Sequence, residues 1–242
     1  MLTEKPWRPD AVILFCGSQL ICLCLGALIA GLLDKAGVSA FKLPDGFGAV
    51  VIGTLSFQGA TWGLLGFFLW QHEVAWRDFF GLRDPGLPRA LVKAILLVAV
   101  LLPVLWGLQQ LFVGILTHFG RPPEEELAVH LVEATKSLGG RIYMGLFAVV
   151  LAPVAEEFIF RGLLFPFIRQ LGFPRLAWLG VSALFALIHW DAATFAPLFV
   201  LALALTWLYN QTGNLLAPIT AHALFNAVNL AVILGSGDTQ AP

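Results

Sequence analysis

The chain has 242 residues, of which 59% are hydrophobic and 12% are charged, and its formal net charge is -1. The charged fraction is about half that of an ordinary soluble domain, so the composition indicates a membrane protein. This near-neutral charge excludes the strongly basic surface that nucleic-acid binding requires. All three cysteines lie in the first apolar run without CxxC spacing, which excludes a disulfide framework and a zinc knuckle.

Three apolar runs in the first half are long enough to cross a bilayer, which takes about 20 residues. They cover residues 11–33, 47–70 and 90–119. The first is too long, and too poorly marked at its end, for a cleaved signal peptide. Between the second and third runs, aromatic residues and arginines interleave over residues 73–83. That segment fits a short helix in the headgroup region as well as a plain connecting loop.

The only long polar stretch covers residues 121–141. It opens with Pro122-Pro123 and closes with Gly139-Gly140, and a run of three glutamates, Glu124 to Glu126, follows the prolines. Acidic residues are favourable in the first turn of a helix because they face the positive end of its dipole. We therefore predict a solvated helix start there and no ligand cluster.

The second half contains four further apolar runs, at residues 143–170, 174–190, 194–209 and 214–234. The two middle runs barely reach the length of a span, so we expect them to be tilted, broken near Trp190-Asp191 or Pro197, or shielded by neighbours. No alternating strand pattern appears, and strands in lipid need a closed barrel. The sequence therefore predicts a single all-α membrane domain over 1–242, a polytopic bundle of about seven transmembrane helices.

The distribution of lysine and arginine gives an orientation for this multi-pass protein. If the N-terminus is inside, eight of these residues in the alternating loops fall inside and five fall outside. Cytoplasmic loops carry the excess of positive charge. We therefore expect the N-terminus on the cytoplasmic side.

The charged residues Glu156, Glu157 and Arg161 lie inside the apolar run 143–170. Each ionised group near the centre of a membrane helix costs roughly 2.5–3.5 kcal/mol, so a chain needs a reason to keep three of them. Glu157 precedes Arg161 by four residues, which is the favourable order for an ion pair on a helix. Glu156 points about 100° further round, has no such neighbour, and is the candidate general base. The alternative is a purely structural ion-pair lock between helices.

Two later runs also carry polar side chains at membrane depth. His189 ends the run 174–190, and His222 and Asn226 lie one helical turn apart in the last run, where they share a face. Alone, each would fit an interfacial histidine or an interhelical hydrogen bond. Taken with the acidic pair, they predict one polar pocket to which three helices contribute.

A glutamate, two histidines and an asparagine in a water-filled pocket are typical of peptide hydrolysis by activated water. The glutamate would take the proton, the imidazoles would hold a metal or polarise the carbonyl, and the amide would donate to the oxyanion. No serine lies in a nucleophile-elbow context, no cysteine lies near a histidine, and the HExxH zinc helix is absent. Water-mediated hydrolysis is therefore the economical choice.

In order and spacing, these motifs resemble those of the CAAX protease and bacteriocin-processing family of intramembrane peptidases, also called Abi: Glu156-Glu157-x-x-x-Arg161, Phe185-x-x-x-His189 and His222-x-x-x-Asn226. The resemblance covers residues 143–234, which we expect to be the catalytic core. The sequence Phe80-Gly81-Leu82-Arg83 before a span is also usual in that family. The first half of the chain otherwise matches only in hydropathy.

The resemblance implies an endopeptidase in which Glu156 activates water and Glu157 and Arg161 support it. By the same resemblance, His189, His222 and Asn226 complete the site. Substrates in the family are prenylated C-terminal tails, bacteriocin precursors or other membrane peptides. We therefore expect a membrane-associated or lipidated peptide substrate, and the bacterial cytoplasmic membrane as the location.

The resemblance leaves two cofactor alternatives open. Glu156, His189 and His222 could hold zinc or another divalent metal, since catalytic zinc commonly takes three protein ligands and one water. In the metal-free alternative, Glu156 works with a histidine while His222 and Asn226 bind the oxyanion. Asparagine is a poor zinc ligand, which favours that role for Asn226.

Two function classes other than an enzyme also fit the polar cluster. One is a membrane scaffold that keeps the cluster as structural glue, and the other is a proton-coupled transporter that uses it as a relay. No internal inverted repeat is apparent, and the polar residues concentrate in the C-terminal half. Both observations weigh against transport.

Overall fold

The computed structural model of the chain describes residues 7–38, 47–121 and 138–237. Within these ranges every regular element is a helix, which confirms the predicted all-α class. The chain divides into two compact units that interleave along the sequence. Of the described residues, unit 1 comprises 75–121 and 156–225, and unit 2 comprises 7–38, 47–74, 138–155 and 226–237. The expectation of one domain over the whole chain stays a prediction.

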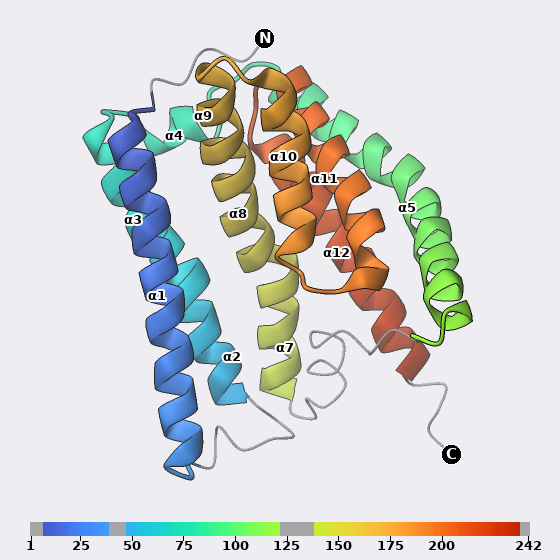
Figure 1. Ribbon diagram of the computed structural model, residues 1–242. Coiled ribbons are helices and arrows are strands. Elements are labelled where there is room, and N and C mark those ends of the chain that lie inside the picture. Colours follow the sequence, from blue (N-terminus) through green and yellow to red (C-terminus); the bar gives the residue numbers. More distant parts are fainter. Residues whose placement is uncertain (1–6, 39–46, 122–137, 238–242) are drawn as a thin grey trace. The chain divides into compact units, whose positions relative to one another are not determined.

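Unit 2 is built around α1, which packs against the helical stretch that follows it in sequence. The stretch consists of three segments that continue one another, the middle one a π-helix (Figure 1). The helices of unit 2 before α12 are α1 (Pro9–Lys35), α2 (Phe47–Thr54), η2 (Leu55–Gly59), α3 (Ala60–Gln71), α7 (Leu138–Leu146), η3 (Phe147–Leu151) and α8 (Ala152–Glu157). The last two residues of α8 belong to unit 1. A hydrogen bond of 2.6 Å from the Tyr143 hydroxyl to Thr54 Oγ1 links α7 to α2.

Unit 1 contains the remaining helices: α4 (Trp76–Phe79), α5 (Leu87–His118), η4 (Phe158–Leu164), α9 (Phe165–Gln170), α10 (Pro174–Leu187), α11 (Ala192–Thr212) and α12 (Leu216–Gly237) as far as Phe225. α11 packs against both α5 and α10, and α10 also contacts α9 and η4. Small and aliphatic side chains of α5, α11 and α12 form a buried apolar core: Ala90, Ala94, Val98, Leu105, Leu201, Leu205, Leu208, Ala217 and Ala221. This core holds α11 in place, and α11 in turn contributes to the site described below.

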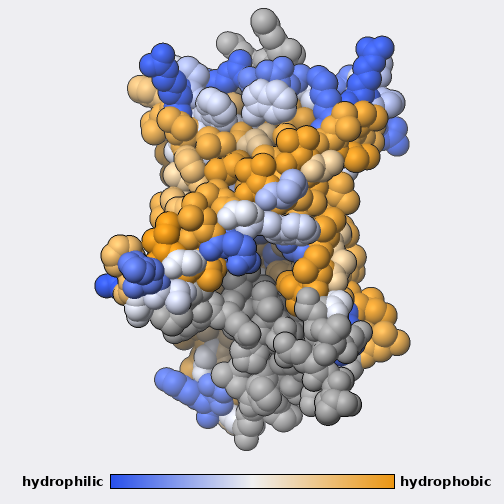
Figure 2. All heavy atoms as spheres, turned by 90° about the vertical axis from the view of Figure 1, so that its right-hand side faces the viewer, coloured by the Kyte–Doolittle hydropathy of each residue, from blue (hydrophilic) through white to orange (hydrophobic). Residues whose placement is uncertain are grey.

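Among the described residues, six helices are long and apolar enough to cross a membrane: Pro9–Lys35, Phe47–Gln71, Leu87–His118, Leu138–Gln170, Ala192–Thr212 and Leu216–Gly235. A shorter apolar helix, Pro174–Leu187, follows the fourth. On the face shown in Figure 2, hydrophilic side chains gather at the upper end and a broad apolar region lies below them, with a smaller hydrophilic group inside it. The chain is therefore an integral, polytopic membrane protein, as predicted, and the part that the structure describes contains six long apolar helices and one short one.

Only one of the two runs expected to be short is short. α10 has 14 residues and a length of about 21 Å, less than the roughly 30 Å of a bilayer core. α11 has 21 residues and continues through Pro197, so the expectation of a short or broken helix was wrong there. Its N-terminus is capped by Asp191, whose side chain accepts a hydrogen bond from the Ala193 amide, and Gly213 with φ 65° ends it. Of the two places expected for a break, the helices are interrupted at the first: residues 188–191, which include Trp190-Asp191, separate α10 from α11.

The predictions for the polar parts of the sequence concern the segments 73–83 and 121–141. The segment 73–83 contains the short helix α4, Trp76–Phe79, rather than a plain loop. The glycines Gly139 and Gly140, expected to close the polar stretch, lie inside α7. The predicted helix start at Glu124 to Glu126 lies outside the described residues.

The span Leu138–Gln170 contains two π-helical segments, η3 and η4, that hydropathy could not show. In a π-helix each backbone bond reaches one residue further than in an α-helix, which rotates the side chains that follow. Such segments are frequent at functional sites. Here η4 begins directly after Glu157 and contains Arg161.

Candidate active site

Glu157 and Arg161 form an ion pair in the interior of unit 1. Arg161 Nη1 donates to Glu157 Oε1 at 2.8 Å, and neither side chain is exposed at all. The predicted pairing of these two residues is therefore confirmed. Two charges removed from solvent in this way need further hydrogen bonds to offset the cost of desolvation.

Those further bonds come from α11. Arg161 Nε donates to Thr206 Oγ1 at 3.3 Å, and Nη2 donates to the carbonyl of Ala202 at 3.0 Å. The guanidinium carbon also lies 4.8 Å from the centre of the Phe185 ring, within the range of a cation–π contact. Thr206 was not among the predicted site residues, although a threonine in the apolar run 194–209 was a usable signal.

Glu157 holds a second partner besides Arg161. The same oxygen, Oε1, lies 2.9 Å from Nδ1 of His222, which is 65 residues away in the sequence and almost fully buried. A carboxylate can only accept, so Nδ1 of His222 carries the proton and donates. In the neutral imidazole the lone pair is then on Nε2. The carboxylate of Glu157 thus fixes both the orientation and the tautomer of His222.

His222 Nε2 faces the other glutamate. It lies 3.8 Å from Glu156 Oε2, which is longer than a hydrogen bond. The side chain of Glu156 is 14% exposed, whereas that of Glu157 is sealed. The structure therefore separates the adjacent glutamates as the helix geometry predicted: Glu157 is a buried anchor, and Glu156 is the carboxylate that can be reached.

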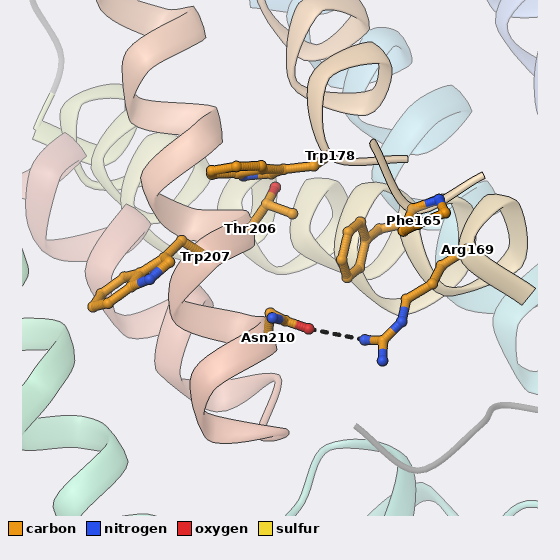
Figure 3. Close-up of a pocket in the computed structure, with 7 residues that line it drawn as sticks. Phe165, Arg169, Trp178, Thr206, Trp207 and Asn210 are labelled. Atoms are coloured by element: carbon orange, nitrogen blue, oxygen red, sulfur yellow. Dashed lines mark hydrogen bonds between the residues drawn. The ribbon is translucent and has the colours of Figure 1, made fainter. Parts of the chain in front are cut away.

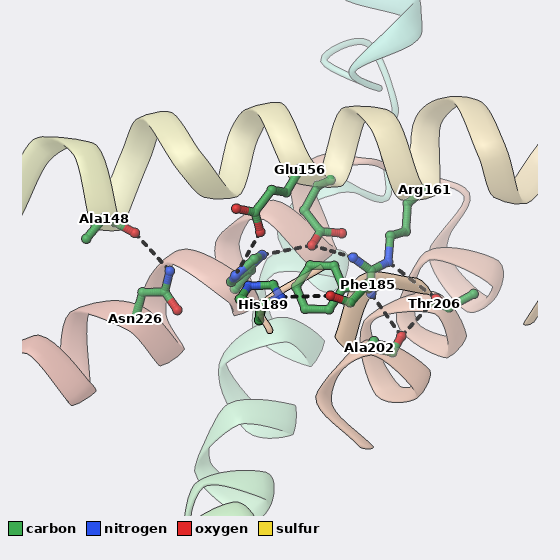
Figure 4. Close-up of polar contacts among 10 residues, drawn as sticks. Ala148, Glu156, Arg161, Phe185, His189, Ala202, Thr206 and Asn226 are labelled. Carbon is green, nitrogen blue, oxygen red and sulfur yellow. Dashed lines mark hydrogen bonds and ion pairs between the residues drawn. The ribbon is translucent and has the colours of Figure 1, made fainter. Parts of the chain in front are cut away.

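His189 is placed by the last turn of α10. Its Nδ1 lies 2.7 Å from the carbonyl of Phe185 and must donate to it, so the free ring nitrogen is Nε2. The Phe185 ring lies 4.9 Å from the His189 ring and 5.6 Å from the His222 ring, between centres. Figure 4 shows Phe185 beside His189, with Glu156 on the helix across from them. The two histidines therefore meet the same phenyl ring.

Asn226 belongs to unit 2. Its amide Nδ2 donates to the carbonyl of Ala148 at 2.8 Å, so α12 is tied here to η3 (Figure 4). The sequence did not predict this backbone partner. A direct role of Asn226 at the reacting centre stays a prediction.

The predicted metal ligands are Glu156, His189 and His222. In the part of the chain that the structure describes, no group of three or more His, Cys, Asp or Glu side chains is arranged to hold a metal ion. A metal ion held by Glu156, His189 and His222 stays a prediction. The tautomers of both histidines leave Nε2 free, which is the arrangement that zinc-bound histidines also have.

The segment Phe80-Gly81-Leu82-Arg83 is anchored to unit 1 by close contacts. Gly81 has φ 71°, and Asn214 Nδ2 donates to its carbonyl at 2.9 Å. A Cβ on Gly81 would lie 2.7 Å from that same Nδ2, so only glycine fits. In α4, just before this segment, Phe79 packs so closely on Gly162 that a Cβ there would lie 2.7 Å from its ring. Gly162 directly follows Arg161, so α4 supports the turn of η4 that carries the arginine.

Comparisons with known proteins agree with these motifs. Residues 138–228 match the family model described as type II CAAX prenyl endopeptidase Rce1-like. The UPF0177 protein YaiF of Lactococcus lactis subsp. lactis (strain IL1403) is 28% identical over 142 residues, which cover 56% of this chain. The aligned part covers 62% of that relative, less than two thirds of its length. No solved structure matches the chain. Since the family match contains all three motifs, the resemblance to the CAAX protease and bacteriocin-processing family is confirmed, and its match covers residues 138–228.

Proposed function

We propose that the chain is an intramembrane endopeptidase that hydrolyses a peptide bond of a membrane-associated substrate with water activated by Glu156. One observation carries the proposal: His222 lies between the two glutamates, with Nδ1 on Glu157 and Nε2 turned to Glu156. A purely structural lock needs only Glu157 and Arg161. The partly exposed Glu156 beside the oriented imidazole has no part in that lock.

The arrangement supports a simple sequence of proton transfers. A water that contacts both Glu156 Oε2 and His222 Nε2 would give its proton to the carboxylate while its oxygen attacks the peptide carbonyl carbon. The tetrahedral intermediate then breaks at the C–N bond, and Glu156 returns the proton to the leaving amine. Glu157 does not react; it holds His222 in the tautomer that accepts from water, as an anchoring carboxylate does in a catalytic triad.

Stabilisation of the oxyanion is the second requirement of this reaction. The metal-free alternative expected from the sequence gave this role to His222 and Asn226. Because His222 faces the water position in this proposal, another donor is needed, and His189 is the exposed residue of the three that the resemblance places in the site. We propose His189 as the residue that contacts the substrate carbonyl, because its ring is fixed by Phe185 while Nε2 remains available. Donation from Nε2 requires the protonated imidazolium.

The metal-free form of this mechanism is the one we propose. Glu156 and His222 supply two groups near one water position, and the described residues offer no third ligand there. Elemental analysis of the purified protein tests this. We expect no stoichiometric metal, whereas one zinc per chain that disappears in His222→Ala would overturn the proposal.

Substrate class is proposed from the family match alone. The description of that family names a prenyl endopeptidase, so a prenylated C-terminal tail is one candidate, and a bacteriocin-like precursor or another membrane peptide is the other. The short α10 and the exposed His189 at its end suit a substrate that approaches from the membrane.

Cleavage of a membrane-peptide library by the purified protein in detergent is the direct test. We expect products with the wild type, a loss of at least about a hundredfold in Glu156→Gln, and no loss in the control Glu73→Gln, an exposed glutamate. Absence of any product, or cleavage that persists in both Glu156→Gln and His189→Ala, would contradict the enzyme. Proton-coupled flux without a cleavage product would indicate the transporter instead, and biological activity that survives Glu156→Gln would indicate the scaffold.

A further inference from the structure

A groove of about 290 Å³ opens on unit 1, apart from the two glutamates. Three helix ends meet around it: α9 ends at Gln170, α10 begins at Pro174 and α11 ends at Thr212. Because the ends of membrane helices lie near the headgroups, the groove lies at the depth where lipid headgroups meet the hydrocarbon. Its lining residues are Phe165, Arg169, Pro174, Trp178, Thr206, Trp207 and Asn210 (Figure 3).

One end of the groove carries a positive charge that no acid neutralises. Arg169 Nη1 donates to Asn210 Oδ1 at 2.8 Å, a neutral partner. Among the described residues, no carboxylate lies within ion-pair distance of Arg169. Because Asn210 Oδ1 accepts the hydrogen bond from Arg169, the Nδ2 group of Asn210 remains available as a donor at the same end of the groove. A guanidinium and an amide donor side by side form a receptor for a phosphate group.

The other end of the groove is aromatic. Trp178 and Trp207 are both exposed, and Trp178 Nε1 donates to the carbonyl of Leu203 at 3.1 Å, which fixes the orientation of its indole. In Figure 3 the two indoles lie toward the opposite side from Arg169. Tryptophan prefers the interface of a membrane, and flat rings of this kind contact lipid chains well.

From this geometry we propose that the groove binds one anionic phospholipid. The phosphate would lie on Arg169 and Asn210, and the upper part of an acyl chain would lie between Trp178 and Trp207. The polar end of the groove suits an anionic group, and the aromatic end suits a hydrocarbon chain. Both ends lie at headgroup depth in an integral membrane protein. A free phosphate would use only the first of these features.

The groove also touches the residue that holds the buried arginine. Thr206 lines it, and Thr206 Oγ1 accepts the hydrogen bond from Arg161 Nε. A bound lipid would therefore contact the side chain that positions the Glu157–Arg161 pair. Lipid binding itself does not depend on proteolysis, so it can be measured whether or not the chain proves to be a peptidase.

Native mass spectrometry of the purified full chain tests the proposal. The protein in neutral detergent is titrated with phosphatidylglycerol and, separately, with phosphatidylcholine, and the retained lipid is counted. We expect phosphatidylglycerol to bind about fivefold more tightly, the effect of one cation at an anionic headgroup. Arg169→Gln should remove this preference, whereas Arg169→Lys should keep most of it.

Two further variants make the test specific. Asn210→Asp hardly changes the size of the side chain but pairs Arg169 with a carboxylate, so it should also abolish the preference. Arg175→Gln removes an exposed arginine that does not line the groove, and should leave the preference unchanged. Equal loss in Arg175→Gln would show a diffuse charge effect and overturn the site. Displacement of the lipid by inorganic phosphate alone, or by a peptide with a free C-terminal carboxylate, would replace the phospholipid with a different ligand.

Discussion

Polar side chains enter the apolar helices in both units, but with different chemistry. In unit 1 the buried polar groups include an ionic network, formed by Glu157, Arg161 and the histidine His222, which lies between Glu157 and Glu156. In unit 2 the buried polar side chains that the structure describes are neutral; Gln19 of α1 is at their centre, with Thr61 of α3 beside it. Each network adjoins a π-helical segment, η4 in unit 1 and η2 in unit 2.

The neutral network of unit 2 provides hydrogen-bond partners for backbone carbonyls. Gln19 Nε2 donates to the carbonyls of Ser56 and Phe57, both in η2 and both at 3.3 Å, and Gln19 Oε1 lies 3.2 Å from the Thr61 hydroxyl. A π-helix leaves backbone carbonyls without their usual partners, and an amide from the neighbouring helix satisfies them. Neutral groups are therefore sufficient to hold a π-helix in a membrane. The ionic groups of unit 1 cost more than that purpose requires, which supports a chemical role for them.

The largest effect is expected at the centre of the ionic network. His222→Gln removes the imidazole from between the glutamates, and we expect kcat/KM for peptide cleavage to fall about 100- to 10,000-fold. The melting temperature in detergent should change far less than it would if the loss of activity came from unfolding. His118→Gln, an exposed histidine at the end of α5, is the control. Retention of activity in His222→Gln would show that the ionic network, like the neutral one, is structural.

The next largest effect concerns stability. Arg161→Met leaves Glu157 as a buried charge without its cation, and we expect a loss of about 3–5 kcal/mol in the free energy of unfolding in detergent. The double variant Glu157→Gln/Arg161→Met should recover part of that loss, because no unpaired charge remains. If Arg161→Met costs less than about 1 kcal/mol, the pair is not isolated from solvent and the contrast between the two networks fails.

In unit 2 the corresponding change should affect stability alone. Gln19→Leu removes the donor for two carbonyls and should cost about 1–3 kcal/mol, with the specific activity of the folded fraction unchanged. Gln110→Leu makes the same substitution at an exposed position of α5 and should be nearly neutral. Thermal unfolding followed by circular dichroism, with an activity assay on the same sample, measures both. A large loss of activity in soluble, folded Gln19→Leu would connect this network to the chemistry.

The smallest effect is expected at the rim of the ionic network. Thr206→Val keeps the shape of the side chain but removes the acceptor for Arg161 Nε, and should cost about 0.5–1.5 kcal/mol in unfolding free energy. Thr117→Val is a matched control, because each threonine also donates to the carbonyl four residues earlier at 2.8 Å. Equal costs for the two variants would mean that the bond from Arg161 contributes nothing measurable.

The local parts of the site were predictable because helix geometry is periodic. The spacing of four residues gave the Glu157–Arg161 pair, and the rotation of 100° per residue separated Glu156 from it. Hydropathy found the spans, but it misjudged α11, whose length depends on the cap at Asp191 and the turn at Gly213. Single residues at the two ends of a run, here the capping Asp191 and the turn residue Gly213, decide where such a helix begins and ends.

The amino-acid sequence by itself determined the membrane class, the spans and the three motifs, since each of these depends on residues that are close together in the chain. Tertiary structure decided that Glu157 is shared by Arg161 and His222, and that Thr206 supports the arginine. It also gave Asn226 a backbone partner in Ala148. Apart from the Glu157–Arg161 pair, these contacts join residues 45 to 78 positions apart, and their partners are chosen by helix packing rather than by the period of any one helix.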